Sequence, residues 1–114
     1  MNTIADISYP FGPCDIQTPA YAATITATIT DRLTIIKPAV LTGALTLNLS
    51  INEGIPAGAR IVFVGLSDTT ARTTTFGTGF TSPTLAGVIS KTKVIEFVYD
   101  GVTFKATSVG VQID

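Results

Sequence analysis

The chain has 114 residues, a formal net charge of −1 and only 13% charged residues. This length suits a single domain with one core, and the charge excludes the basic surface expected of a nucleic-acid-binding protein. An average soluble domain has about 25% charged residues, and the mean hydropathy here is +0.48. We therefore expect much of the surface to be covered by identical copies or by a larger assembly.

Residues 1–20 predict an extended N-terminal arm, because prolines remove backbone donors and the segment has no sustained periodicity. Its apolar side chains need cover on their own domain or on a neighbour, and the sequence leaves both open. We expect the arm to provide a partner contact through Tyr9, Pro10, Phe11 and Ile16. No basic segment precedes an apolar run, so no signal peptide is expected. The uncharged stretch 73–90 contains Thr, Gly and Pro, so no membrane-spanning helix is expected either.

Residues 21–110 predict a β-domain, followed by a short tail at 111–114. Threonine alternates with apolar residues in ATITATIT (23–30), and leucine alternates with polar residues in ALTLNLSI (44–51). LTII (33–36) and TTTF (73–76) predict shorter strands, whereas ARIVFVGL (59–66) is apolar throughout and predicts a central strand buried on both faces. Threonine occurs 20 times, and its branched side chain favours strands. We predict an all-β fold: a small antiparallel β-sandwich, jelly-roll-like, with an extended N-terminal arm.

KVIEFVYDGVTFKATS (93–108) predicts a β-hairpin, because Asp100 and Gly101 form a strong turn signal between two β-prone runs. A two-residue turn would pair Tyr99 with Val102 and would place Phe97 opposite Phe104. Asp100 and Gly101 are therefore predicted to be structural turn residues.

The residue types argue against catalysis and against a metal or cofactor site. The chain has no histidine and a single cysteine, Cys14, which is interpreted as an incidental apolar residue. Glu96 is a mid-strand carboxylate, for which an outward-facing or interface position is the simplest explanation. FGTGF (76–80) lacks the lysine and the helix of a phosphate-binding loop, so its phenylalanines are interpreted as anchors of a loop. We predict no catalytic residue, no metal and no cofactor.

The order of YAATITATIT, LTGALTLNLS, GARIVFVGLSDTTARTTTFGTGF and KVIEFVYDGVTFKATS resembles a loose group of β-rich tailed-bacteriophage proteins, the head-fibre and capsid-decoration proteins. The resemblance covers about residues 20–108 and lies in the residue types of these segments and in their order along the chain. It implies a non-enzymatic virion protein that is displayed on the capsid exterior, is made in the bacterial cytoplasm and is often trimeric. The implied partners are further copies of the chain and the major capsid protein or another virion protein.

Two other functions remain open at this stage. One is a receptor- or glycan-binding module of a phage tail or head fibre, which would contact a glycan on the host surface. The other is a cellular carbohydrate-binding accessory domain. Both would need exposed aromatic side chains, for which Tyr9, Tyr21 and Phe80 are candidates, and the usual sugar-stacking residue, tryptophan, is absent.

Overall fold

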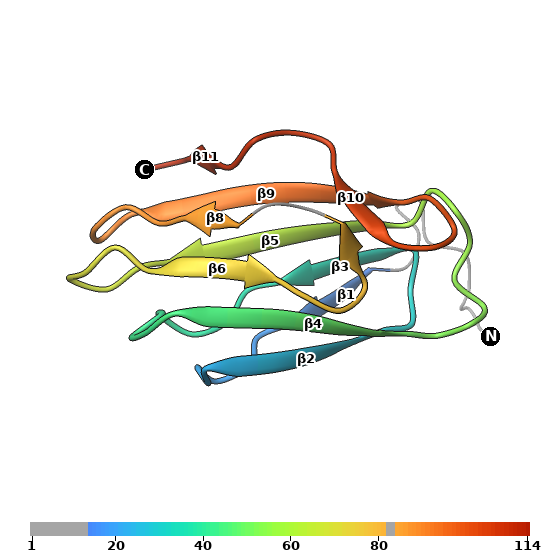
Figure 1. The fold of residues 1–114 in the computed structure, drawn as a ribbon, viewed down its shortest axis with the longest axis horizontal. Helices are drawn as coiled ribbons and strands as arrows, with labels where there is room; N and C mark the ends of the chain where they lie inside the picture. The colour runs from blue at the N-terminus through green and yellow to red at the C-terminus, as the bar shows by residue number, and fades with distance from the viewer. Residues whose placement is uncertain (1–13, 82–83) are drawn as a thin grey trace.

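The structure is a computed structural model that describes residues 14–81 and 84–114. These residues are all-β and contain no helix, hence none long and apolar enough to cross a membrane. Their strands, labelled in Figure 1, are β1 (Asp15–Gln17), β2 (Thr24–Ile29), β3 (Leu33–Ile36), β4 (Leu45–Ile51), β5 (Arg60–Leu66), β6 (Thr73–Phe76), β7 (Phe80–Thr81), β8 (Leu85–Ala86), β9 (Thr92–Tyr99), β10 (Phe104–Ala106) and β11 (Val111–Gln112).

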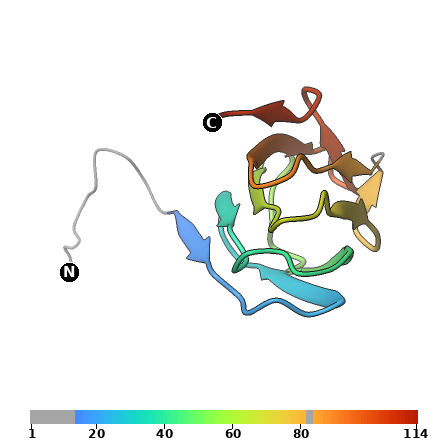
Figure 2. The ribbon, with the colours of Figure 1, turned by 90° about the vertical axis from the view of Figure 1, so that its left-hand side faces the viewer.

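The strands form two sheets that enclose one core. The seven-strand sheet has the order β1-β3-β5-β9-β10-β7, with β11 paired to β9, and the four-strand sheet has the order β2-β4-β6-β8. From β1 to β6 the chain alternates between the two sheets, and the end-on view of Figure 2 shows this winding.

The pairing of β1 to β6 is parallel, which corrects the prediction of an antiparallel jelly roll. In the seven-strand sheet β1 pairs with β3 and β3 with β5; in the four-strand sheet β2 pairs with β4 and β4 with β6. Each turn of the chain thus stacks on the previous one, as in a solenoid. The prediction failed because alternating side chains indicate a half-buried strand without indicating the direction of its neighbour.

Antiparallel pairing begins with β8, and its longest example is β9, which runs along β5 from Arg60↔Val98 to Leu66↔Thr92. Strands β10 and β11 pair with β9 as well, and β8 pairs antiparallel with β6. The last parallel strand of each sheet, β5 or β6, therefore has an antiparallel neighbour on its other side.

The predicted hairpin is present as β9 and β10, but its register differs from the prediction. Phe104 pairs with Tyr99, so the turn has four residues and Val102 is 77% exposed. The Asp100 carboxylate accepts hydrogen bonds from the backbone N–H groups of Val102 and Thr103, at 2.8 and 2.9 Å, and Gly101 has φ +99°. These bonds favour the longer turn, and the two-residue shift leaves Phe97 and Phe104 on the core face.

The core lies between the sheets and joins them through aromatic rings. Phe97 of β9 contacts Phe76 of β6 and Phe80 of β7, each with ring centroids 4.8 Å apart, and Phe63 of β5 meets Phe76 at 5.5 Å. The aliphatic and small core residues around them are Ile25, Ala27, Ile29, Ile36, Leu41, Leu45, Leu47, Leu49, Ala59, Ile61, Leu85 and Ile95.

The predicted arm and tail both contribute strands. Residues 1–13 lie outside the described residues, but β1 pairs with β3, and the Gln17 carbonyl accepts the Lys37 N–H at 2.8 Å. At the other end, β11 pairs with β9 through Val111 and Gln112. Strands of two or three residues are too short to produce a periodic pattern, which is why the sequence did not predict them.

Candidate interaction surface

The outer face of the four-strand sheet is polar. Side chains alternate along each strand, so the residues between the core positions of β2, β4 and β6 point outward. They are Thr24, Thr26, Thr28, Thr46, Asn48, Ser50, Thr73 and Thr75. This face has the composition expected of a sheet surface that contacts water.

The outer face of the seven-strand sheet is aliphatic over most of its area. Since Ile61 and Phe63 are fully buried, Val62 and Val64 of the same strand point away from the core. The apolar outward residues, which we call the aliphatic face, are Ile16, Leu33, Ile35, Val62, Val64, Leu66, Val94, Val98 and Val111.

Strand register makes this face continuous. One row runs from Ile16 through Ile35 to Val62 across β1, β3 and β5. A second row runs from Val64 through Val94 to Val111 across β5, β9 and β11. The interior members are half-buried because their neighbours shield them, whereas Ile16 is 65% and Val111 is 52% exposed. A contiguous apolar patch of this kind is typical of an interaction site, unlike single exposed apolar residues.

A groove of about 440 Å³ adjoins the aliphatic face where β5 ends. Its lining is mainly apolar and consists of Lys37, Pro38, Ala39, Val40, Val64, Leu66, Thr92 and Ile113. Val40 and Ile113 are 43% and 62% exposed. The groove therefore extends the aliphatic surface beyond the regular strands.

The two charges in the middle of the aliphatic face pair with each other. Arg60 Nη1 donates to Glu96 Oε2 at 2.9 Å, between neighbouring strands β5 and β9. Both side chains are exposed, so the pair stabilises the fold by at most about 1 kcal/mol. Glu96 lies on the outer face, where its alternation with Ile95 and Phe97 predicted it, and an interface role for it stays a prediction.

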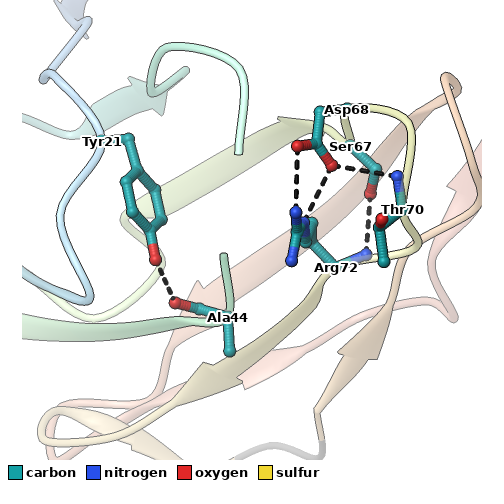
Figure 3. A network of polar contacts seen from close by, with 6 residues as sticks. All are labelled: Tyr21, Ala44, Ser67, Asp68, Thr70 and Arg72. Carbon is teal, nitrogen blue, oxygen red and sulfur yellow. Dashed lines mark hydrogen bonds and ion pairs between the residues drawn. The ribbon is translucent and has the colours of Figure 1, made fainter. Parts of the chain in front are cut away.

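Another polar cluster lies between β5 and β6 and has a structural explanation (Figure 3). Arg72 Nε and Nη2 donate to the Asp68 carboxylate at 2.8 and 3.0 Å, and Asp68 also accepts the Thr70 N–H. The hydrogen bond from Arg72, and next the one from Thr70, lower the pKa of Asp68 from its ordinary value. Ser67 Oγ accepts the Arg72 N–H at 3.1 Å. These bonds hold the connection between the strands in place, and the cluster offers no nucleophile or proton-transfer pair.

A second groove, of about 360 Å³, lies where β2 and β4 end. It is lined by Thr30, Asp31, Arg32, Asn52, Gly54, Ile55 and Pro56. Asp31 is its only carboxylate, so the groove lacks a pair of groups for acid–base catalysis. Within residues 14–81 and 84–114, no three His, Cys, Asp or Glu side chains gather to hold a metal ion.

The structure describes some of the predicted site residues. Tyr9, Pro10 and Phe11 are outside the described residues, whereas Ile16 lies on the aliphatic face. Asp100 and Gly101 lie in the β9–β10 turn, and Cys14 is exposed.

Two of the candidate sugar-stacking aromatics, Phe80 and Tyr21, make contacts within the chain, and the third, Tyr9, lies outside the described residues. Phe80 is only 9% exposed and packs against Phe76, so it is a core residue. Tyr21 packs partly against the core, and its hydroxyl donates to the Ala44 carbonyl at 2.8 Å (Figure 3). Gly79, the second glycine of FGTGF, has φ +90°, and a Cβ there would lie 2.8 Å from Leu49. Backbone conformation and packing therefore explain this glycine, and no bound ligand is needed to explain it.

The sequence contained a signal for the aliphatic face that was interpreted differently. The uninterrupted apolar run ARIVFVGL predicted a strand buried on both faces. The structure places β5 centrally, between β3 and β9, but leaves Val62 and Val64 half-buried on an outer surface. An apolar run can therefore indicate an uncovered aliphatic face as well as a doubly buried strand.

Comparison with protein families, with curated proteins and with solved structures found no match. The fold and the surface themselves define the class of protein. It is an all-β protein with two sheets, solenoid-like stacking, one polar outer face and one aliphatic outer face.

Proposed function

We propose that the chain is a structural virion protein of a tailed bacteriophage, which decorates or projects from the capsid exterior as a homo-oligomer. The observation that carries the proposal is the continuous aliphatic face on a chain with few charges. Such a surface suits permanent contact between subunits better than the reversible binding of a small polar substrate.

The phage assignment itself rests on the resemblance in residue texture and order over about residues 20–108. That resemblance also supplies the trimer as the expected stoichiometry and the capsid surface as the expected location.

Mass spectrometry of purified particles tests this proposal. The experiment compares particles from cells that carry the intact gene with particles from cells in which a stop codon replaces an early codon. We expect peptides of this chain in the first sample, at a copy number that is a fixed fraction of the major capsid protein. If intact particles lack the chain, or contain it only in traces, the virion assignment is wrong.

A receptor- or glycan-binding module is the second candidate, and one observation favours it. The polar face presents hydroxyl and amide groups in rows, with Thr24 beside Thr46 and Thr46 beside Thr75 across β2, β4 and β6. Such groups can donate to and accept from sugar hydroxyls. Binding of the purified chain to host-cell envelopes, compared between wild type and Thr46→Lys, tests this function, and equal binding by the two would exclude the polar face.

A further inference from the structure

We infer that the aliphatic face is where copies of the chain meet, so that each copy covers its aliphatic face with the aliphatic face of another copy. The inference deepens the proposed function, on which it rests, by naming the surface and the occupant. No described segment of the chain covers Ile16, Val111 or Ile113, all of which are more than half exposed.

The shape of the face suits an identical partner. Both sides of such a contact are sheets, and two sheets pack face to face at about 10 Å with their side chains interdigitated. The aliphatic residues Val62, Val64 and Val94 lie in the middle of the face, and the more exposed Ile16 and Val111 lie towards its edges. Protein interfaces that have an apolar centre show the same distribution of side chains.

The charges also favour a second copy over a charged partner. The face carries Arg60 and Glu96, which already pair within the chain. Lys105 of β10 lies beside Val98 on the same side of the sheet and already pairs with Asp100. With net charge −1, the chain presents little charge with which to attract a strongly acidic or basic partner. In a symmetric contact each Arg60 can also face a Glu96 of the other copy, so the face is electrostatically complementary to itself.

The area is close to what a stable contact needs. The five strands contribute 3, 4, 7, 8 and 2 residues. At about 3.3 Å per residue and about 4.8 Å between strands, they cover on the order of 400 Å² of flat area. Protruding side chains and the groove at Val40 and Ile113 add accessible surface, which brings the face towards the roughly 800 Å² that each partner contributes to a standard interface.

Three lysine variants of the full chain test the inference. Val64→Lys places a charge in the centre of the face, and Val111→Lys places one where the side chain is already 52% exposed, so that the fold tolerates it. Thr26→Lys is the matched control, because Thr26 lies mid-strand on the opposite, polar face. Light scattering after size-exclusion chromatography gives the mass of each, and circular dichroism with thermal unfolding shows whether each is folded.

We expect wild type and Thr26→Lys to have the mass of a dimer, because a face that covers an identical face forms a two-fold contact between two copies. This differs from the trimer that the resemblance implies. Val64→Lys and Val111→Lys should raise the dissociation constant by about tenfold or more, because each contact would bury unpaired charges. A monomeric wild type at every concentration overturns the inference, and so do Val64→Lys and Val111→Lys variants that are folded and as oligomeric as wild type.

A fluorescence reporter gives a second test that does not depend on the lysine variants. The chain contains no tryptophan, so a single introduced tryptophan reports only on its own surroundings. Val111→Trp should emit at shorter wavelength in the oligomer and shift to longer wavelength on dilution, whereas Thr26→Trp should emit at long wavelength throughout. Identical, concentration-independent emission from both would overturn the inference.

Failure of the inference and failure of the proposed function give different results. Suppose that the wild-type chain is a monomer and is present in particles, whereas the Val111→Lys variant is absent from them. The aliphatic face then contacts another virion protein. In that case the occupant is wrong and the function stands. An oligomer that forms through the face but is absent from particles leaves the inference intact and overturns the virion assignment.

Discussion

At the scale of single residues, two buried hydroxyl groups have opposite surroundings. Thr34 is fully buried in β3, and its Oγ1 has no hydrogen-bond partner among the described residues. Ser67 is 2% exposed, and its Oγ accepts the Arg72 N–H. A buried polar group without a partner is costly, whereas a paired one stabilises the fold.

We predict that Thr34→Val raises the free energy of unfolding by roughly 1–2 kcal/mol, because valine keeps the shape and removes the unpaired hydroxyl. Ser67→Ala should lower it by roughly 1 kcal/mol or more, because the Arg72 N–H loses its acceptor. Urea denaturation of both variants measures the two effects. Destabilisation by Thr34→Val would mean that its hydroxyl has a partner in solution.

The Asp100 carboxylate links stability to pH. Its hydrogen bond with Lys105, and then those with the Thr103 and Val102 N–H groups, hold the pKa of Asp100 well below its ordinary value. An unfolded aspartate has a pKa of about 3.9. Because the folded pKa is lower, the stabilisation is complete above about pH 4 and is lost as the pH falls below it.

We therefore predict that the wild-type melting temperature falls between about pH 5 and pH 2, and that it falls less in Asp100→Asn. The asparagine can still accept the two backbone hydrogen bonds but does not titrate. Part of the fall should remain, because the pKa values of Asp68 and Asp114 are also lowered in the folded chain. Parallel curves for the two proteins would show that Asp100 is not held as described.

At the scale of elements, β1 connects the two sheets. It pairs in parallel with β3, and the Gln17 side chain donates from Nε2 to the Thr28 carbonyl of β2 at 2.8 Å. The sequence predicted residues 1–20 as an extended arm and indicated no strand within it. The pairing of Asp15–Gln17 changes that expectation.

Two truncations separate the strand from the residues before it. Removal of residues 1–18 should lower the free energy of unfolding by roughly 1–3 kcal/mol more than removal of residues 1–14, because only the longer deletion removes the β1–β3 hydrogen bonds at about 0.5–1.5 kcal/mol each. Urea denaturation compares the two. Equal stability would indicate that β1 contributes nothing to the domain.

At the scale of the whole molecule, the two outer faces differ in how favourably they contact water. The polar face can remain in water, whereas the aliphatic face favours burial. The contact that we infer between copies contains mainly apolar side chains, beside the Arg60–Glu96 pair and the polar groove residues Lys37 and Thr92. Its stability should therefore come mainly from the hydrophobic effect.

We predict that the oligomer persists between about 0.1 M and about 1 M NaCl, although the screening length falls from about 10 Å to about 3 Å over this range. Sedimentation velocity at constant protein concentration measures the mass at each salt concentration. Dissociation at high salt would indicate that charged groups, rather than the aliphatic face, hold the copies together.

The candidate surface was only partly predictable for a physical reason. Sparse charge predicted a surface that is covered by identical copies or by a larger assembly, and this stays a prediction. Ile16, one of the predicted contact residues, lies on the aliphatic face. The other members come from β3, β5, β9 and β11, which are distant in the sequence and become neighbours only through pairing. The candidate Phe80 was wrong for the same reason, since its burial depends on contacts with Phe76 and Phe97.

The sequence by itself determined where the main strands lie, which of their residues share a face, and where the β9–β10 hairpin turns. Those features are local, because alternation and turn chemistry act over a few residues. The tertiary structure decided that β1 to β6 pair in parallel, that β1 and β11 exist, and that the turn has four residues. Every residue except proline has the same backbone donor and acceptor, so the choice and direction of a neighbouring strand depend on how the whole core packs.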